Sequence, residues 1–182
     1  MRVCFDLGER DLHYFRERLQ KVSRGKSAWA EDRVILGAAK LVTDVAAADP
    51  PDFVRERIAK LSRLIDMLRD REWRLEGADR TRILDSLAYF VDPDDIIPDR
   101  VPGLGYLDDA IMVEIVVREL AHDLDAYDDF CDYRKRSPET EDEARREGRR
   151  EALQARMRRR RRSERSIQRS SPRSSRSPIG LW

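Results

Sequence analysis

Six aspartates in one short stretch are the residues whose type and spacing point most directly to chemistry: Asp92, Asp94, Asp95, Asp99, Asp108 and Asp109. Carboxylate oxygens are the ligands that hard cations such as Mg²⁺ and Ca²⁺ prefer, and a turn in the chain would bring them together. The sequence therefore offers a divalent-metal site at Asp95, Asp99, Asp108 and Asp109, and with it a metal-dependent hydrolase. No other cofactor is expected.

The same stretch also has a purely structural interpretation. Prolines and a glycine punctuate it at Pro93, Pro98, Pro102 and Gly105, as in a specified turn, and the calcium-loop spacing with its glutamate is absent. Aspartates at such positions cap turns and suit the first turn of a helix. We expect one of the Asp108/Asp109 pair to be buried and to accept hydrogen bonds from backbone N–H groups of residues 92–99. Both interpretations stay open.

The remaining residues that could carry chemistry are isolated in the sequence. His13 and His122 are far apart, and neither lies beside Cys4 or Cys131, which are themselves too distant for a metal-binding pair. We assign no catalytic residue, and the sequence leaves open whether the chain is an enzyme, with the balance against. The cysteine usage fits a reducing cytoplasm.

The distribution of charge suggests a second kind of site, one for polyanions. Residues 1–142 hold 23 Lys and Arg against 32 Asp and Glu, whereas residues 143–182 hold 14 against 4. The basic part contains the unbroken run Arg158, Arg159, Arg160, Arg161 and Arg162. Such a run neutralises phosphates without reading sequence, so an acidic protein, a nucleic acid or an anionic lipid surface is the expected partner. A solvated tail without a partner, or one folded back on the body, is the alternative.

Helical periodicity dominates the elements that would position these residues. Charged residues make up 40% of the chain, against about 25% in average domains, and apolar residues recur at three- and four-residue spacing. The pattern predicts an all-α bundle of about five helices, near residues 8–25, 27–49, 52–75, 79–91 and 104–136, with the Pro/Asp-rich loop between the last two. Asp79 is expected to cap the fourth helix and Gly77 to end the third. The fifth helix is apolar on almost every face around residues 111–117, so it should be central.

The bundle is predicted to occupy residues 1–137, with two basic segments after it. Residues 138–157 read as a helix that carries no apolar stripe, so we expect it to project. The Arg/Ser-rich residues 158–182 read as disordered, because their composition cannot bury enough apolar surface to offset ordering entropy. No stretch is apolar enough for a transmembrane segment.

The loop residues together resemble the hallmark of the YkvA-like family of small bacterial helical domains, over about residues 83–120. The matching positions are Asp92, Pro93, Asp95, Ile97, Pro98, Asp99, Pro102, Gly105, Leu107, Asp108 and Asp109. The resemblance implies a compact helical domain and, in some members, membrane association; the family has no assigned activity. From the sequence we therefore predict a non-catalytic interaction or regulatory module, with the loop as scaffold and the tail as the contact to an acidic partner.

Overall fold

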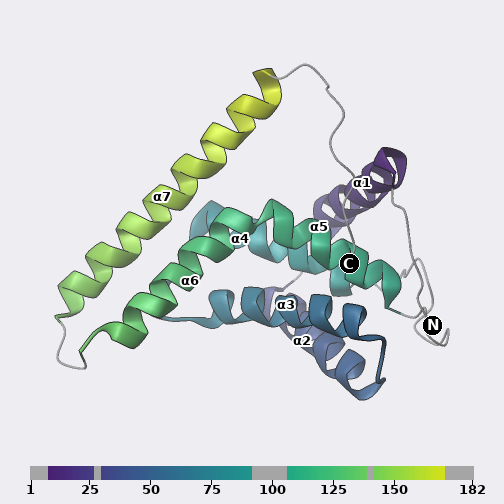
Figure 1. Ribbon diagram of the computed structural model, residues 1–182, viewed down its shortest axis with the longest axis horizontal. Coiled ribbons are helices and arrows are strands. Elements are labelled where there is room, and N and C mark those ends of the chain that lie inside the picture. The colour runs from purple at the N-terminus through teal and green to yellow at the C-terminus, as the bar shows by residue number, and fades with distance from the viewer. Residues whose placement is uncertain (1–7, 27–29, 92–105, 139–141, 171–182) are drawn as a thin grey trace.

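The computed structural model describes residues 8–26, 30–91, 106–138 and 142–170, and within them every regular element is a helix (Figure 1). The elements are α1 (Glu9–Lys26), α2 (Glu31–Ala47), α3 (Asp52–Arg69), α4 (Gly77–Leu87), the 3₁₀ helix η1 (Ala88–Val91), α5 (Leu107–Glu119), α6 (Ala121–Arg136) and α7 (Glu143–Ser170). The all-α class predicted from periodicity is confirmed. None of the described helices is both long and apolar enough to cross a membrane.

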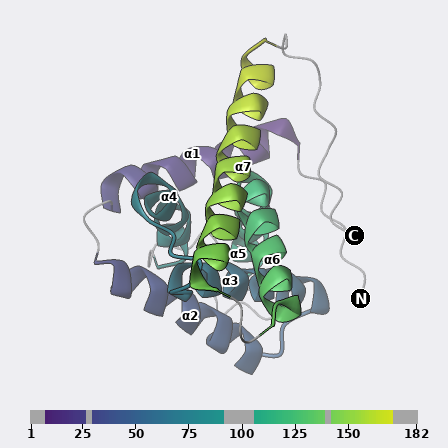
Figure 2. The same cartoon turned by 90° about the vertical axis from the view of Figure 1, so that its left-hand side faces the viewer.

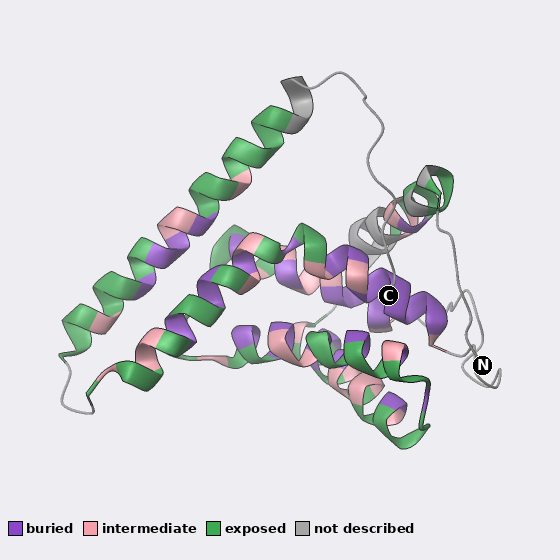
Figure 3. Ribbon diagram, in the orientation of Figure 1, coloured by how far each residue is buried: buried purple, intermediate pink, exposed green. Residues whose placement is uncertain are grey.

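The core lies between α3 and α5, with α2 packed on α3 from the other side (Figure 1). The apolar residues that recur at three- and four-residue spacing along α3 are buried: Val54, Ile58, Leu61, Leu64, Ile65 and Leu68. On α5 nearly every residue from Leu107 to Val116 is buried, which Figure 3 shows as an almost continuous purple ribbon. The prediction that this helix is central is therefore confirmed, and its burial follows from apolar side chains on all its faces.

The third helix ends earlier than periodicity predicts, at Arg69, because the next side chain closes a turn. The Asp70 carboxylate accepts hydrogen bonds from the backbone N–H groups of Glu72 at 2.9 Å and Trp73 at 3.0 Å. An aspartate that bonds the backbone two and three residues ahead competes with helix continuation. Gly77, with φ of 56°, begins α4 after this turn, so the expectation that it ends the third helix is wrong.

The long fifth helix expected over residues 104–136 is two helices, α5 and α6, joined at Leu120. Leu120 has φ of −102° and ψ of 12°, and its carbonyl accepts the N–H groups of both Asp123 and Leu124 at 2.9 Å. The change of direction carries α6 away from α5 and along α7 (Figures 1 and 2). Apolar periodicity continues across the break, which is why the sequence does not show it.

The segment before the Asp/Pro loop is held by a close approach of two elements. A Cβ atom built on Gly37 of α2 would lie 2.7 Å from both Cγ atoms of Val91, the last residue of η1. Only glycine lets α2 come this near to η1 without a shift. Packing of α2 on η1 therefore fixes where the chain enters the loop.

The C-terminal helix α7 runs antiparallel to α6 and lies against it in both views (Figures 1 and 2). It extends from Glu143 to Ser170, beyond residue 157, and it buries Leu153 and Met157 to 2% and 1% exposure. The structure thus differs from the expected projecting helix and from disorder beginning at residue 158; residues 171–182 lie outside the described part. The reason is a contact face of mixed character, apolar at two positions and polar or charged at the others, which an apolar stripe alone does not reveal.

Candidate functional site

The loop aspartates fall mostly outside what the structure describes. Asp108 and Asp109 lie in the first turn of α5 and are 2% and 6% exposed. The other residues named for the loop, Asp92, Pro93, Asp94, Asp95, Pro98, Asp99, Pro102 and Gly105, lie outside the described ranges. Among the residues that are described, no group of three or more His, Cys, Asp or Glu is arranged to hold a metal. The metal site at Asp95, Asp99, Asp108 and Asp109 therefore stays a prediction, as do hydrogen bonds from the loop to the Asp108/Asp109 pair.

A different set of charged side chains converges where α4, α6 and α7 meet. Asp79 of α4 is 7% exposed and Asp123 of α6 is 0% exposed. Arg161 of α7 bridges them, with Nη1 at 2.6 Å from Asp123 Oδ1 and Nη2 bonded to Asp79 Oδ1. Arg158, one turn earlier on α7, donates from Nε to Asp79 Oδ2 at 2.7 Å. We call these four residues and Arg82 the acid–arginine cluster.

Arg82 joins this cluster to the break between α5 and α6. Its Nη1 lies 3.2 Å from Asp123 Oδ2, while its Nη2 donates to the carbonyl of Glu119, the last residue of α5. That carbonyl is one of those that a helix end leaves without an intrahelical partner. A single guanidinium therefore caps α5 and fixes the start of α6.

The two carboxyl groups of the cluster are shifted in opposite directions. Burial raises the pKa of Asp123 above the ordinary value, and the positive charges of Arg82 and Arg161 reduce this effect without overcoming it. Burial acts the same way on Asp79, but hydrogen bonds from Arg161 and Arg158 outweigh it and hold the pKa of Asp79 below its usual range. Guanidinium groups stay charged at all physiological pH values, so the cluster is suited to clamping helices rather than to transferring protons.

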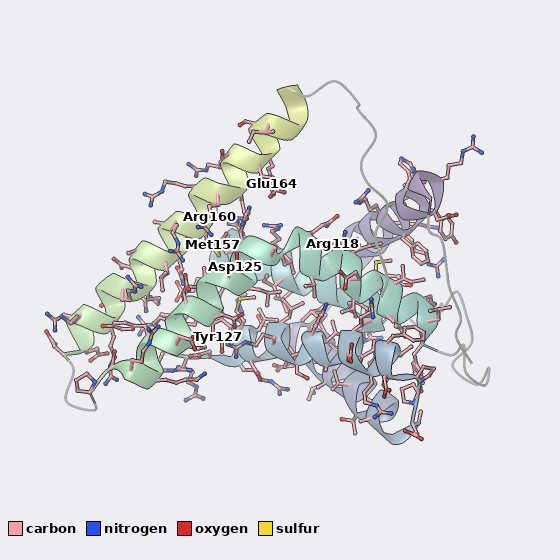
Figure 4. All side chains as sticks on the ribbon, viewed as in Figure 1. Arg118, Asp125, Tyr127, Met157, Arg160 and Glu164 are labelled. Carbon is pink, nitrogen blue, oxygen red and sulfur yellow. The ribbon has the colours of Figure 1, made fainter. Side chains whose placement is uncertain are left out.

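Further pairs continue the contact along the length of α6 and α7. Arg156 binds Asp129, Arg160 lies 3.9 Å from Asp125, and His122 Nε2 lies 3.1 Å from Glu164. The pairs with Asp129 and Asp125 advance by one turn on each helix in opposite directions, as an antiparallel pair requires; Figure 4 labels Asp125 and Arg160. Between them Met157 packs into the core, and Gln154 Nε2 donates to the carbonyl of Trp73 at 2.8 Å.

The five arginines predicted to bind a polyanion differ in whether they pair with the body of the protein. Arg158 and Arg161 turn inward to the cluster, and Arg160 lies near Asp125. Arg159 and Arg162 are exposed and form no ion pair with any described residue. The run in the sequence is thus divided into three arginines that pair with carboxylates of α4 and α6 and two that pair with no described residue.

A further carboxylate, Asp70, whose side chain is 8% exposed, organises the loop between α3 and α4. Besides its two backbone bonds, it accepts from the Tyr127 hydroxyl at 3.1 Å and lies 3.0 Å from Arg134 Nη1. Burial tends to raise the pKa of Asp70, but the backbone N–H of Trp73 and the charge of Arg134, with the other donors, bring it below the ordinary value. The bond to Tyr127 ties this loop to α6, so Asp70 positions Trp73 beneath α7.

One comparison with known proteins gives a match. A family model described as "Protein of unknown function (DUF1232)" matches residues 80–115. The match covers about a fifth of the chain, from the second turn of α4 through η1 and the loop into α5. No curated protein and no solved structure matches.

The matched segment and the acid–arginine cluster overlap at Arg82 alone. Asp79, Asp123, Arg158 and Arg161 lie on either side of residues 80–115. Sequence reasoning missed Asp79, expected there as a helix cap, and it also missed Asp123 and Arg82. The sequence does contain one sign that α7 docks with Arg161 facing the body: Leu153, Met157 and Arg161 follow at four-residue spacing and so share one face of the helix.

Proposed function

We propose that this chain is a non-catalytic interaction or regulatory module that contacts an acidic partner through the outward-facing arginines of α7. The loop segment that resembles the YkvA-like family and matches the family model serves as the helical scaffold. We place the module in the cytoplasm, in keeping with its two widely separated cysteines.

One observation carries the proposal, namely that α7 is docked on one side and basic on the other. From Glu143 to Ser170 the helix holds twelve arginines against four glutamates. Its inner side is buried at Arg150, Leu153, Gln154, Met157 and partly at Arg161. The arginines that remain exposed include Arg145, Arg159, Arg162 and Arg165. A rigid helix that presents spaced cations loses less side-chain and backbone entropy on binding than a disordered tail does.

The groups that pair in the structure fit an interface better than a reaction centre. The described histidines each face a glutamate, His13 beside Glu17 at 3.5 Å and His122 beside Glu164 at 3.1 Å. The carboxylates of Asp70, Asp79 and Asp123 are engaged by arginines. Such pairs specify the geometry of helices.

The proposal is tested by binding a fluorescent poly-glutamate peptide to the full chain at low salt. Arg159→Gln with Arg162→Gln should weaken binding about tenfold, since each exposed ion pair contributes up to about 1 kcal/mol. The matched control is Arg10→Gln with Arg69→Gln, which removes the same charge from exposed positions on α1 and α3. Equal weakening by both double variants would show that only net charge matters and would overturn the assignment to α7.

A further inference from the structure

We propose that the partner of α7 is the phosphate backbone of a nucleic-acid duplex, and that Asp79 and Asp123 act as intramolecular phosphate mimics that hold Arg158 and Arg161 back from it. This inference rests on the proposed function, because it names the partner and the control of the same helix.

The arginines near the C-terminal end of α7 form one stripe that the cluster interrupts. Arg158, Arg162 and Arg165 follow at i, i+4 and i+7, so they share a face, and Arg161 lies at its edge. The stripe is about 10 Å long, a length over which a duplex presents about six phosphate charges. Arg162 and Arg165 are exposed; Arg158 is also exposed, at 46% of its side chain, but its guanidinium, like that of the less exposed Arg161, is bound to Asp79. Release of the two inner arginines would double the number of cations on this face.

The composition of α7 favours a duplex over other phosphate-bearing surfaces. The helix contains no aromatic residue from Glu143 to Ser170, so it offers no platform for stacking the bases of a single strand. Its two buried apolar residues, Leu153 and Met157, face α6, while the exposed Ile167 lies on the other side of the helix from the arginine stripe. An interfacial membrane helix needs an exposed apolar face beside its cations, whereas the apolar residues Leu153 and Met157 of α7 are already buried. Backbone phosphates require only the cations.

The stripe is also accessible where it leaves the body. His122, at the start of α6, faces Glu164, so the turns of α7 after Glu164 extend past the N-terminal end of α6 (Figures 1 and 4). The described side chains from Arg162 to Ile167 are exposed. A duplex can therefore engage Arg162 and Arg165 first and then compete with the carboxylates for Arg158 and Arg161. Both competitors offer the same bidentate, charge-assisted hydrogen bonds to a guanidinium.

The decisive experiment measures binding of a fluorescent DNA duplex to the full chain at fixed low salt. Asp79→Asn should tighten binding about fivefold, because the acid no longer competes for Arg158 and Arg161. The matched control is Asp128→Asn, which changes net charge equally but removes a partner of Arg63 on α3. Equal tightening by the two variants would mean that net charge alone acts and would overturn the inference.

A second pair of variants tests the same claim from α7, in case loss of Asp79 unfolds the chain. Arg158→Gln should weaken duplex binding about fivefold, since this arginine joins the stripe once it is released. Arg156→Gln, which removes an arginine paired with Asp129 on another side of the helix, should change binding less than about twofold. If Arg156→Gln weakened duplex binding more than Arg158→Gln does, the assignment of binding to the arginine stripe would be refuted.

Two further ligands separate this inference from the proposed function. Binding of the poly-glutamate peptide without binding of the duplex would leave the acidic-partner proposal standing and remove the duplex. Binding of vesicles of phosphatidylcholine and phosphatidylserine without binding of the duplex would assign the stripe to a membrane surface instead. Failure of all three ligands would overturn both proposals.

Discussion

Replacing Arg161 by methionine removes the cation that two buried carboxylates share. The Arg161 side chain is 12% exposed, and it binds Asp79 at 10% and Asp123 at 0% side-chain exposure. Methionine keeps most of the apolar stem of arginine, so the change removes charge and hydrogen bonds more than packing.

The expected loss of docking free energy depends on which arginine partners Asp79 and Asp123 keep after the substitution. Removing one partner of a buried ion pair costs about 3 to 5 kcal/mol, because the other charge is left without compensation. Asp79 keeps Arg158 and Asp123 keeps Arg82 after the change. We therefore expect the lower end of that range, a loss of about 3 kcal/mol in the free energy that docks α7.

The appropriate assay is native-state hydrogen exchange of α7, because this helix packs mainly against α6 and exchange reports its opening separately from that of α3 and α5. A loss of about 3 kcal/mol should raise the opening equilibrium about a hundredfold, with smaller changes in α3 and α5. Arg160→Met is the matched control, since Arg160 is the neighbouring arginine, 50% exposed and 3.9 Å from Asp125. An exposed pair of this kind contributes less than about 1 kcal/mol. If Arg160→Met and Arg161→Met open α7 equally, the cluster does not dock the helix.

Two other perturbations test the parts of the fold that support the site. Gly37→Ala should lower the melting temperature, because its Cβ atom would lie 2.7 Å from the Cγ atoms of Val91. Gly148→Ala, whose Cβ atom would have nothing within 4 Å, should raise the stability by up to about 1 kcal/mol through helix propensity. Thermal unfolding followed by circular dichroism compares the two variants, and stabilisation by both would refute the close approach of α2 to η1. Asp70→Asn should flatten the acid side of the stability profile in urea titrations. Because the pKa of Asp70 is lowered in the folded state, its contribution is complete above the unfolded carboxyl value and is lost as pH falls through the lowered one. An unchanged slope between about pH 5 and pH 2 would contradict this role.

Sequence patterns were most informative where one kind of interaction repeats along a helix. The stripe Val54, Ile58, Leu61 and Leu68 is buried as its spacing requires, and the apolar α5 is central. Both follow from burial of apolar surface, which depends on the periodicity of a helix and not on which neighbour covers it. The apolar pattern predicted the wrong end for α3, because Asp70 ends this helix by accepting hydrogen bonds from backbone N–H groups, an interaction that apolar spacing does not reveal.

The sequence by itself determined that this chain is helical, that its body is acidic and that its C-terminal part is basic. Only the tertiary structure decided that α7 docks, because the residues that hold it lie far apart in the chain: Asp79 and Arg158 are 79 positions apart, and Asp123 and Arg161 are 38 apart. Charge pairing between residues so far apart in the chain depends on where the helices cross. Leu153 and Met157 alone are too few apolar positions to predict from the sequence that α7 docks. The break at Leu120 is the step that brings Asp123 to Arg82 and Arg161, and no proline or glycine marks it in the sequence.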